Sequence, residues 1–147
     1  MTHVVRFKME HLEKIELREP DRSDVESIPH FKKACEMYEK LGGAYTLLSE
    51  DGVVCIAGVT PIWPGVGSAW SITSDLVKKY PKSYYKATLQ FLGAISGDWK
   101  LHRIQTTTHC DNEIAANWLE HLGFVCEGVM KAYGVDKKDH YLYARVN

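Results

Sequence analysis

The sequence lacks the features that most directly assign a chain to a class. It has no basic surplus, because 18 Lys and Arg face 19 Asp and Glu for a formal net charge of −1. Non-specific nucleic-acid binding needs such a surplus, so a generic polyanion binder is excluded. No apolar run approaches the roughly 20 residues that span a bilayer, and residues 1–10 are too polar for a secretory signal. We therefore expect a cytoplasmic chain with no nucleic-acid or membrane partner.

Metal-binding and disulfide patterns are also missing. The four cysteines are Cys35, Cys55, Cys110 and Cys126. None are spaced C-x-x-C and no His/Cys cluster has zinc spacing, so no metal site is predicted. Free thiols are expected in a cytosol. Cys55 and Cys126 lie in apolar runs and are predicted to be small core residues.

What is present fits one globular domain. The 147 residues are 45% hydrophobic and 25% charged, without repeats or a linker. We predict a single domain over residues 1–147, with residues 1–12 as an N-terminal extension. The alternation of polar and apolar residues over 14–18 predicts the first strand.

Hydrophobic periodicity and turn residues predict the remaining elements. Further strands are expected at 44–49, 53–60, 69–73, 101–108, 124–130 and 140–146. Helices are expected at 24–40 with a break near Pro29, at 82–96, and at 112–121 with Asp111 as the cap. Residues 61–67 are predicted to be a loop. The order predicts an α/β fold with a mixed, mostly antiparallel twisted sheet and flanking helices.

One strand pair is predicted to be parallel. The helix at 82–96 makes a crossover between the strands at 69–73 and 101–108. The motif order predicts that the sheet splays between these two strands. The end of such a pair is a common ligand site in α/β sheets.

The most informative motif is in residues 109–124, HCDNEIAANWLEHLGF. A strand is followed by Asn112, two residues, Ala115 and a helix that ends in Leu-Gly-Phe. This pattern resembles the fourth-helix signature of the GCN5-related N-acetyltransferase (GNAT) superfamily. Residues 15–20, 127–129 and 139–143 look similar to its ribosomal-protein-acetylating branch. The resemblance covers residues 13–146.

The resemblance implies the GNAT fold and acetyl-CoA as a co-substrate. Backbone groups of Ser71, Ile72 and Thr73 would then bind the pantetheine arm and polarise the thioester carbonyl. The helix that starts near Lys82 would point its N-terminus at the pyrophosphate. Asn112 would bind the cofactor or an ordered water beside it.

The chain departs from the GNAT pattern at the phosphate loop. Residues 75–84 hold no glycine, although glycines let backbone amides approach phosphate closely. Lys79, Lys82 and the Ser83 hydroxyl are the candidates to contact the pyrophosphate instead. The alternative is that these lysines belong to a solvated loop.

The catalytic groups of the family are also incomplete. Many members carry a Tyr in the fourth helix as general acid, and the corresponding residue here is Leu119. His109 is our candidate base and Tyr133 our candidate acid. The plainer alternatives are local hydrogen bonding for His109 and packing for Tyr133.

A second resemblance gives a rival function. Residues 70–75, WSITSD, followed by a basic helix start without glycine, look like a small acetyltransferase-fold family of short-tailed bacteriophages. One hypothesis is thus an acyl-CoA-dependent N-acyltransferase acting on a primary amine of a protein or small molecule. The other is a non-catalytic phage protein for virion assembly or host interaction, found in the host cytoplasm or the virion. The expected partners are acyl-CoA and an unidentified amine acceptor or protein, with a second copy of the chain as an open alternative.

Overall fold

The computed structural model describes residues 1–147 and contains one mixed sheet with flanking helices. The strands are β1 (Thr2–Arg6), β2 (Ala44–Ser49), β3 (Gly52–Trp63), β4 (Val66–Thr73), β5 (Arg103–His109), β6 (Val125–Met130) and β7 (His140–Val146). The helices are α1 (Met9–Lys14), α2 (Asp21–Ser27), α3 (Phe31–Leu41), α4 (Pro81–Asp98), α5 (Glu113–His121) and the short 3₁₀ helix η1 (Asp75–Lys78).

The seven strands follow the order β1-β2-β3-β4-β5-β7-β6. The β4–β5 pair is parallel, whereas the pairs β1–β2, β2–β3, β5–β7 and β6–β7 are antiparallel. This confirms the predicted α/β class, the mostly antiparallel sheet and the predicted crossover through α4. None of the helices combines the length and apolar character that a bilayer span requires.

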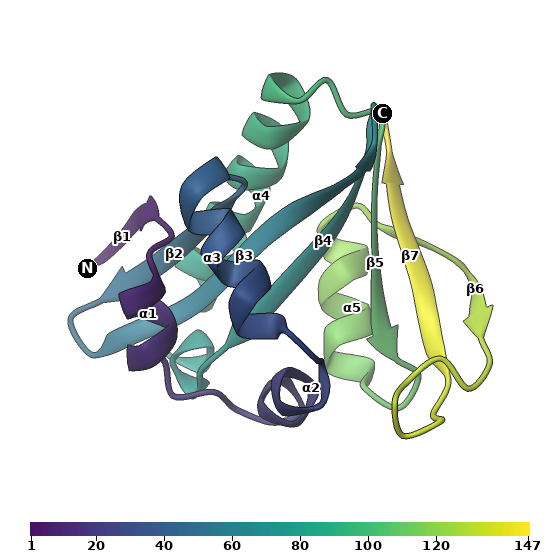
Figure 1. Ribbon diagram of the computed structural model, residues 1–147, viewed down its shortest axis with the longest axis horizontal. Helices are drawn as coiled ribbons and strands as arrows, with labels where there is room; N and C mark the ends of the chain where they lie inside the picture. Colours follow the sequence, from purple (N-terminus) through teal and green to yellow (C-terminus); the bar gives the residue numbers. More distant parts are fainter. The chain divides into compact units, whose positions relative to one another are not determined.

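Two compact units make up the chain, and each is described by itself. Unit 1 contains Met1–Val59 and Trp70–Ala94, and unit 2 contains Thr60–Ala69 and Ile95–Asn147. In unit 1 hydrophobic clusters cover both faces of the strands. On one face α1, α2 and α3 pack around Phe7, Ile56 and Ile72. On the other face η1 and α4 pack around Leu47, Val54 and Ala87. Figure 1 shows α3 and α4 on opposite sides of β2 and β3.

The start of the chain differs from the prediction. The strand predicted at 14–18 is wrong, because Lys14 ends α1 and residues 15–18 form no strand. The edge of β2 is already paired with β1, from Thr2 opposite Ser49 to Arg6 opposite Tyr45. Residues 1–12, predicted to be an extension, supply β1 and most of α1. The predicted break near Pro29 is confirmed by the gap between α2 and α3.

The loop predicted at 61–67 is largely strand. β3 continues to Trp63 and β4 begins at Val66, so only Pro64 and Gly65 remain as the turn. Gly65 has a φ of 87°, which residues with a side chain rarely adopt. A two-residue hairpin therefore replaces the loop.

In unit 2 the pairing between β4 and β5 is short. Val66, Gly67 and Ser68 pair with Arg103, Ile104 and Gln105. The Thr106 hydroxyl then donates to the Ala69 carbonyl at 2.9 Å. Residues 70–73 of β4 lie beyond this ladder.

The far edge of unit 2 corrects one prediction about the core. Cys55 is fully buried as predicted, but Cys126 is exposed. β6 is an edge strand whose residues Val125–Val129 are all exposed, so no core covers this apolar run. All four cysteines are free thiols.

Candidate functional site

The end of β4 is tied to the segment that leads into α2. The backbone N–H of Thr73 donates to Asp21 Oδ2 at 2.7 Å, and the Thr73 hydroxyl donates to the same oxygen at 2.6 Å. The backbone N–H of Arg18 donates to the Thr73 carbonyl at 3.0 Å. Arg18 Nε also donates to the Thr73 hydroxyl oxygen at 2.9 Å. The backbone groups of Thr73, predicted to contact a cofactor, are thus already bonded within the chain.

Asp21 is a half-buried carboxylate without a direct ion pair. Its two hydrogen bonds both fall on Oδ2, and the nearby Arg18 guanidinium bonds Thr73 rather than the carboxylate. Burial raises the pKa of Asp21 above its ordinary value, against the lowering by the two bonds from Thr73. The negative charge of Asp24 raises it further. A carboxylate in this setting is a better proton acceptor than an exposed one.

The other two predicted residues on β4 point to opposite faces. Ser71 is exposed, and its hydroxyl lies 3.4 Å from the Tyr84 hydroxyl on α4. Ile72 is buried in the cluster beneath α1, α2 and α3, so its side chain is a core residue. Burial raises the pKa of Tyr84, and the charge of Asp21 adds to this increase. Asp21 and Tyr84 therefore lie within electrostatic range of each other.

The segment after β4 forms a compact turn in place of a glycine loop. The Ser74 hydroxyl donates to the Val53 carbonyl at 2.7 Å and accepts from the backbone N–H of Leu76 at 3.3 Å, which caps η1. Pro81 is the first residue of α4, where its missing N–H costs nothing. Lys82 is exposed and Ser83 is half-buried at the start of this helix.

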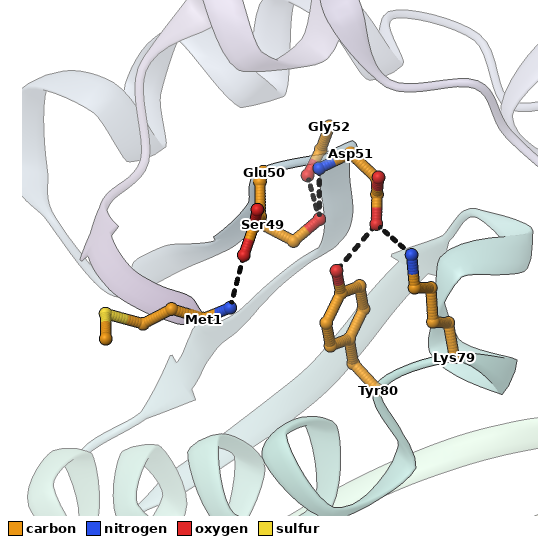
Figure 2. A network of polar contacts seen from close by, with 7 residues as sticks. All are labelled: Met1, Ser49, Glu50, Asp51, Gly52, Lys79 and Tyr80. Atoms are coloured by element: carbon orange, nitrogen blue, oxygen red, sulfur yellow. Dashed lines mark hydrogen bonds and ion pairs between the residues drawn. The ribbon is translucent and has the colours of Figure 1, made fainter.

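Lys79 is engaged with an acidic turn of the same unit. Its Nζ lies 2.6 Å from Asp51 Oδ2, and the Tyr80 hydroxyl donates to the same oxygen at 2.6 Å. Asp51 lies in the turn between β2 and β3, as Figure 2 shows. Nothing in the sequence predicts the contact between Asp51 and Lys79, which lie 28 positions apart.

In unit 2 the structure brings the two candidate catalytic residues to one histidine. His109 on β5 lies directly opposite His140 on β7, and their ring centroids are 4.2 Å apart. The Tyr133 ring lies 5.2 Å from that of His140. His140 is buried, whereas Tyr133 is 56% exposed. The geometry gathers three groups that can hold or move a proton.

Asn112 begins α5 and its side chain is used locally. Its Oδ1 accepts a hydrogen bond from the backbone N–H of Ala115 at 3.1 Å. The predicted cap, Asp111, is wrong, because Asn112 occupies the N-cap position. The Asp111 carboxylate instead lies 3.8 Å from Lys138 Nζ at the surface.

We expect Asn112→Ala to lower the free energy of unfolding by about 1 kcal/mol, the usual cost of losing an N-cap. Urea denaturation measures this change. Asn112→Asp keeps an acceptor for the Ala115 N–H and is expected to stay near wild type. Asp111→Ala is the matched control. A larger loss in Asp111→Ala than in Asn112→Ala would contradict the capping assignment.

Sequence reasoning missed three residues: Asp21, Asp51 and His140. Nothing in the sequence around Asp21 indicates a contact with Thr73, 52 positions away. His140 carried a usable signal, because the strands at 101–108 and 140–146 were both predicted. Their pairing places His140 opposite His109. No cluster of three or more His, Cys, Asp or Glu residues is arranged to hold a metal ion.

Comparison with known proteins identifies the fold. No protein-family model matches the sequence, and no curated protein matches it. Among solved structures, Ard1 from Thermoplasma volcanium matches with a TM-score of 0.78 at 10% identity, over 99% of this chain and 97% of that one. A GNAT-family acetyltransferase from Bacillus anthracis matches at 0.70 and 18% identity, over 99% and 94%. The ribosomal-protein-S5-alanine acetyltransferase from Vibrio fischeri matches at 0.67 and 18% identity, over 99% and 93%. The chain therefore has the fold of the GNAT acetyltransferases over essentially its whole length.

Proposed function

We propose that the chain is an acetyl-CoA-dependent N-acetyltransferase that acts on a primary amine. The proposal rests on how unit 1 arranges its residues around the β4–η1–α4 segment. Ser71 is exposed on β4, and the half-buried Asp21 lies at the end of that strand. The basic residues Lys79 and Lys82 lie near the start of α4. A strand edge, a proton acceptor and cations are the groups that thioester binding and amine acylation require.

The residues of unit 1 fit acetyl-CoA in part. The cations Lys79 and Lys82, with the Ser83 hydroxyl, would hold the pyrophosphate at the start of α4. Thr73 cannot donate its backbone N–H without losing Asp21, so the contacts to the pantetheine arm fall on Ser71 and the backbone of Ile72. Acetyl-CoA supplies the activated acetyl group when bound.

Asp21 would accept the proton of the amine. An alkylammonium must lose a proton before its nitrogen can attack a carbonyl carbon, and Asp21 is a fixed carboxylate beside Thr73 with a raised pKa. The negative charge of Asp24 on the same helix adds to the attraction for a cationic amine. The leaving thiolate then needs a proton. Burial raises the pKa of Tyr84, which makes its hydroxyl a weak acid, so the thiolate takes its proton from solvent water.

The cluster of unit 2 offers a second set of proton carriers. His109 remains our candidate base and Tyr133 our candidate acid, with His140 in ring contact with both. His140 would position the other two rather than react itself. Asn112 would bind the cofactor or a water only by sharing the oxygen that already caps α5.

A second candidate function is a non-catalytic protein on this fold, for assembly or host interaction. Four observations favour it. Both Thr73 backbone groups are bonded to residues 18–21, Lys79 is neutralised by Asp51, and Asn112 caps its helix. Leu119 also stands where many GNAT enzymes have a tyrosine.

The first test is thermal denaturation with millimolar acetyl-CoA. If the proposal is right, the melting temperature rises, because a ligand stabilises the state that it binds; about 100 times its Kd adds roughly 2.7 kcal/mol. Acetyl transfer is then measured by release of free CoA thiol with spermidine and an alanine-initiated peptide as acceptors. These follow the substrates named for the spermidine and S5-alanine acetyltransferases among the similar structures. No rise in melting temperature would favour the non-catalytic function.

A further inference from the structure

The turn between β2 and β3 carries an anion that faces the residues before α4. Asp51 Oδ2 receives two donors, Lys79 Nζ and the Tyr80 hydroxyl, each at 2.6 Å. Both side chains converge on one oxygen (Figure 2). The neighbouring acid, Glu50, points to the N-terminal amine of Met1 at 2.9 Å instead. Of the two acidic residues in this turn, Asp51 is therefore the one that accepts the hydrogen bonds of Lys79 and Tyr80.

The turn holds Asp51 in place through its own backbone. The Ser49 hydroxyl donates to the Gly52 carbonyl at 2.9 Å and accepts from the backbone N–H of Asp51 at 3.2 Å. Hydrogen bonds from Lys79 and Tyr80 keep the pKa of Asp51 below its usual range. The same bonds raise the pKa of Lys79 and of Tyr80. At neutral pH the arrangement thus has one anion, one cation and one neutral phenol donor.

Two donors that meet at a single anionic oxygen form the kind of arrangement that binds a phosphate oxygen. Charge-assisted bonds from an ammonium and a hydroxyl are the strong contacts to such oxygens. The ion pair is readily broken, because the side chain of Lys79 is 62% exposed and that of Asp51 is 40% exposed. A doubly charged diphosphate competes well with one carboxylate for the same donors.

We propose that Asp51 is an internal competitor at the phosphate-binding donors of this chain, so that the diphosphate of CoA must displace it from Lys79 and Tyr80. The inference rests on the proposed function, since it concerns the same cofactor. The apparent affinity for CoA is the intrinsic affinity reduced by the fraction of molecules in which the two donors are released. Asp51 thereby sets the threshold concentration of CoA at which the site fills.

The test is calorimetric titration of CoA into wild type and Asp51→Asn. Asn keeps the turn and its side-chain oxygen, but it removes the charge that competes with the phosphates. We expect the Kd for CoA to fall about three- to tenfold, a change of the size that one nearby charge produces at the surface. Adding Lys79→Met to Asp51→Asn should abolish the gain.

Two matched controls remove the same charge nearby. Glu50→Gln alters the adjacent residue of the turn, which pairs with Met1. Asp75→Asn alters η1, where Asp75 lies 3.6 Å from Lys78 Nζ rather than at Lys79. Both should change the Kd less than Asp51→Asn does, by about twofold or less, because neither carboxylate bonds Lys79 or Tyr80 and exposed charges without direct contact are screened by salt. Equal gains in all three variants would overturn the proposal and leave only a general charge effect.

The outcomes separate this inference from the proposed function. CoA binding that is unchanged or weaker in Asp51→Asn overturns the role of Asp51 but leaves the acetyltransferase proposal intact. If no variant binds CoA, the proposed function fails, and inorganic pyrophosphate is titrated next. Pyrophosphate binding to Asp51→Asn that Lys79→Met removes would support the site. Absence of that binding would overturn it.

Discussion

Asp21→Asn is expected to lower kcat for amine acetylation about 100-fold, the lower end of what a general base contributes. The asparagine side-chain oxygen can still accept both hydrogen bonds from Thr73, so the anchor between α2 and β4 is kept. Only the ability to take a proton is lost. The Kd for acetyl-CoA should therefore stay near that of wild type. The measurements are steady-state kinetics with the amine panel and calorimetry with acetyl-CoA.

The pH profile gives this prediction a second readout. Because burial raises the pKa of Asp21, the carboxyl binds its proton more tightly than an ordinary aspartate does. The rate of wild type should rise with pH through that raised pKa, as the base becomes ionised. The variant should lack this limb and recover part of its rate at high pH, where the amine deprotonates in solution.

Asp24→Asn is the matched control, because it removes the same charge from the same helix without touching Thr73. It should change KM for a cationic amine more than kcat. If Asp21→Asn turns over as fast as wild type, Asp21 is only an anchor. The base is then His109, and His109→Gln should show the loss instead.

The sequence allowed the class of fold to be predicted because its signals are local. Gly42 marks the end of α3, hydrophobic periodicity marks α4, and the crossover through α4 requires a parallel pair. Which segment pairs with the edge of a sheet, by contrast, depends on residues far away in the sequence. Residues 15–18 alternate as a strand should, but β1 already occupies the edge of β2, so alternation alone predicted the wrong segment. The prediction that Cys126 is buried was wrong for a related reason, since periodicity does not show that β6 lies at the sheet's edge.

The candidate site was harder to predict, because its contacts join distant residues of one unit. Asp21 meets Thr73 and Asp51 meets Lys79 across 52 and 28 positions of the chain. Asp21 lies in no motif, and Asp51-Gly52 is a turn signature that indicates no distant partner for the carboxylate. By contrast, His109 and Tyr133 were chosen for their chemistry, and both lie against His140. His109 does so because β5 and β7 pair in register, whereas Tyr133 reaches His140 from the segment between β6 and β7. Residues able to carry a proton could thus be chosen from the sequence. The residues that bond Thr73 and Lys79, which are Asp21 and Asp51, could not.

Gly58→Ala is expected to lower the free energy of unfolding by about 2 kcal/mol, within the usual cost of overpacking a core. A Cβ on Gly58 would lie 2.7 Å from the Gly43 carbonyl oxygen and 2.8 Å from Trp70 Cζ2. The carbonyl cannot retreat freely, because it accepts the backbone N–H of Val59 at 2.8 Å. The Trp70 ring is also confined, 4.9 Å from the Tyr38 ring. Urea denaturation followed by circular dichroism measures the loss.

The control is the same substitution at a helical glycine. Gly93 lies in the interior of α4 with nothing within 4 Å of an added Cβ. Gly93→Ala should therefore raise stability, by up to about 1 kcal/mol from helix propensity. Opposite signs for one chemical change would show that close approach at Gly58, and not glycine itself, decides the result. Trp70 directly precedes Ser71 on β4, so the strain at Gly58 should also weaken acetyl-CoA binding, whereas Gly93→Ala should not. A Gly58→Ala protein as stable as wild type would mean that β3 and β4 can move apart, and that the position of Ser71 does not depend on this contact.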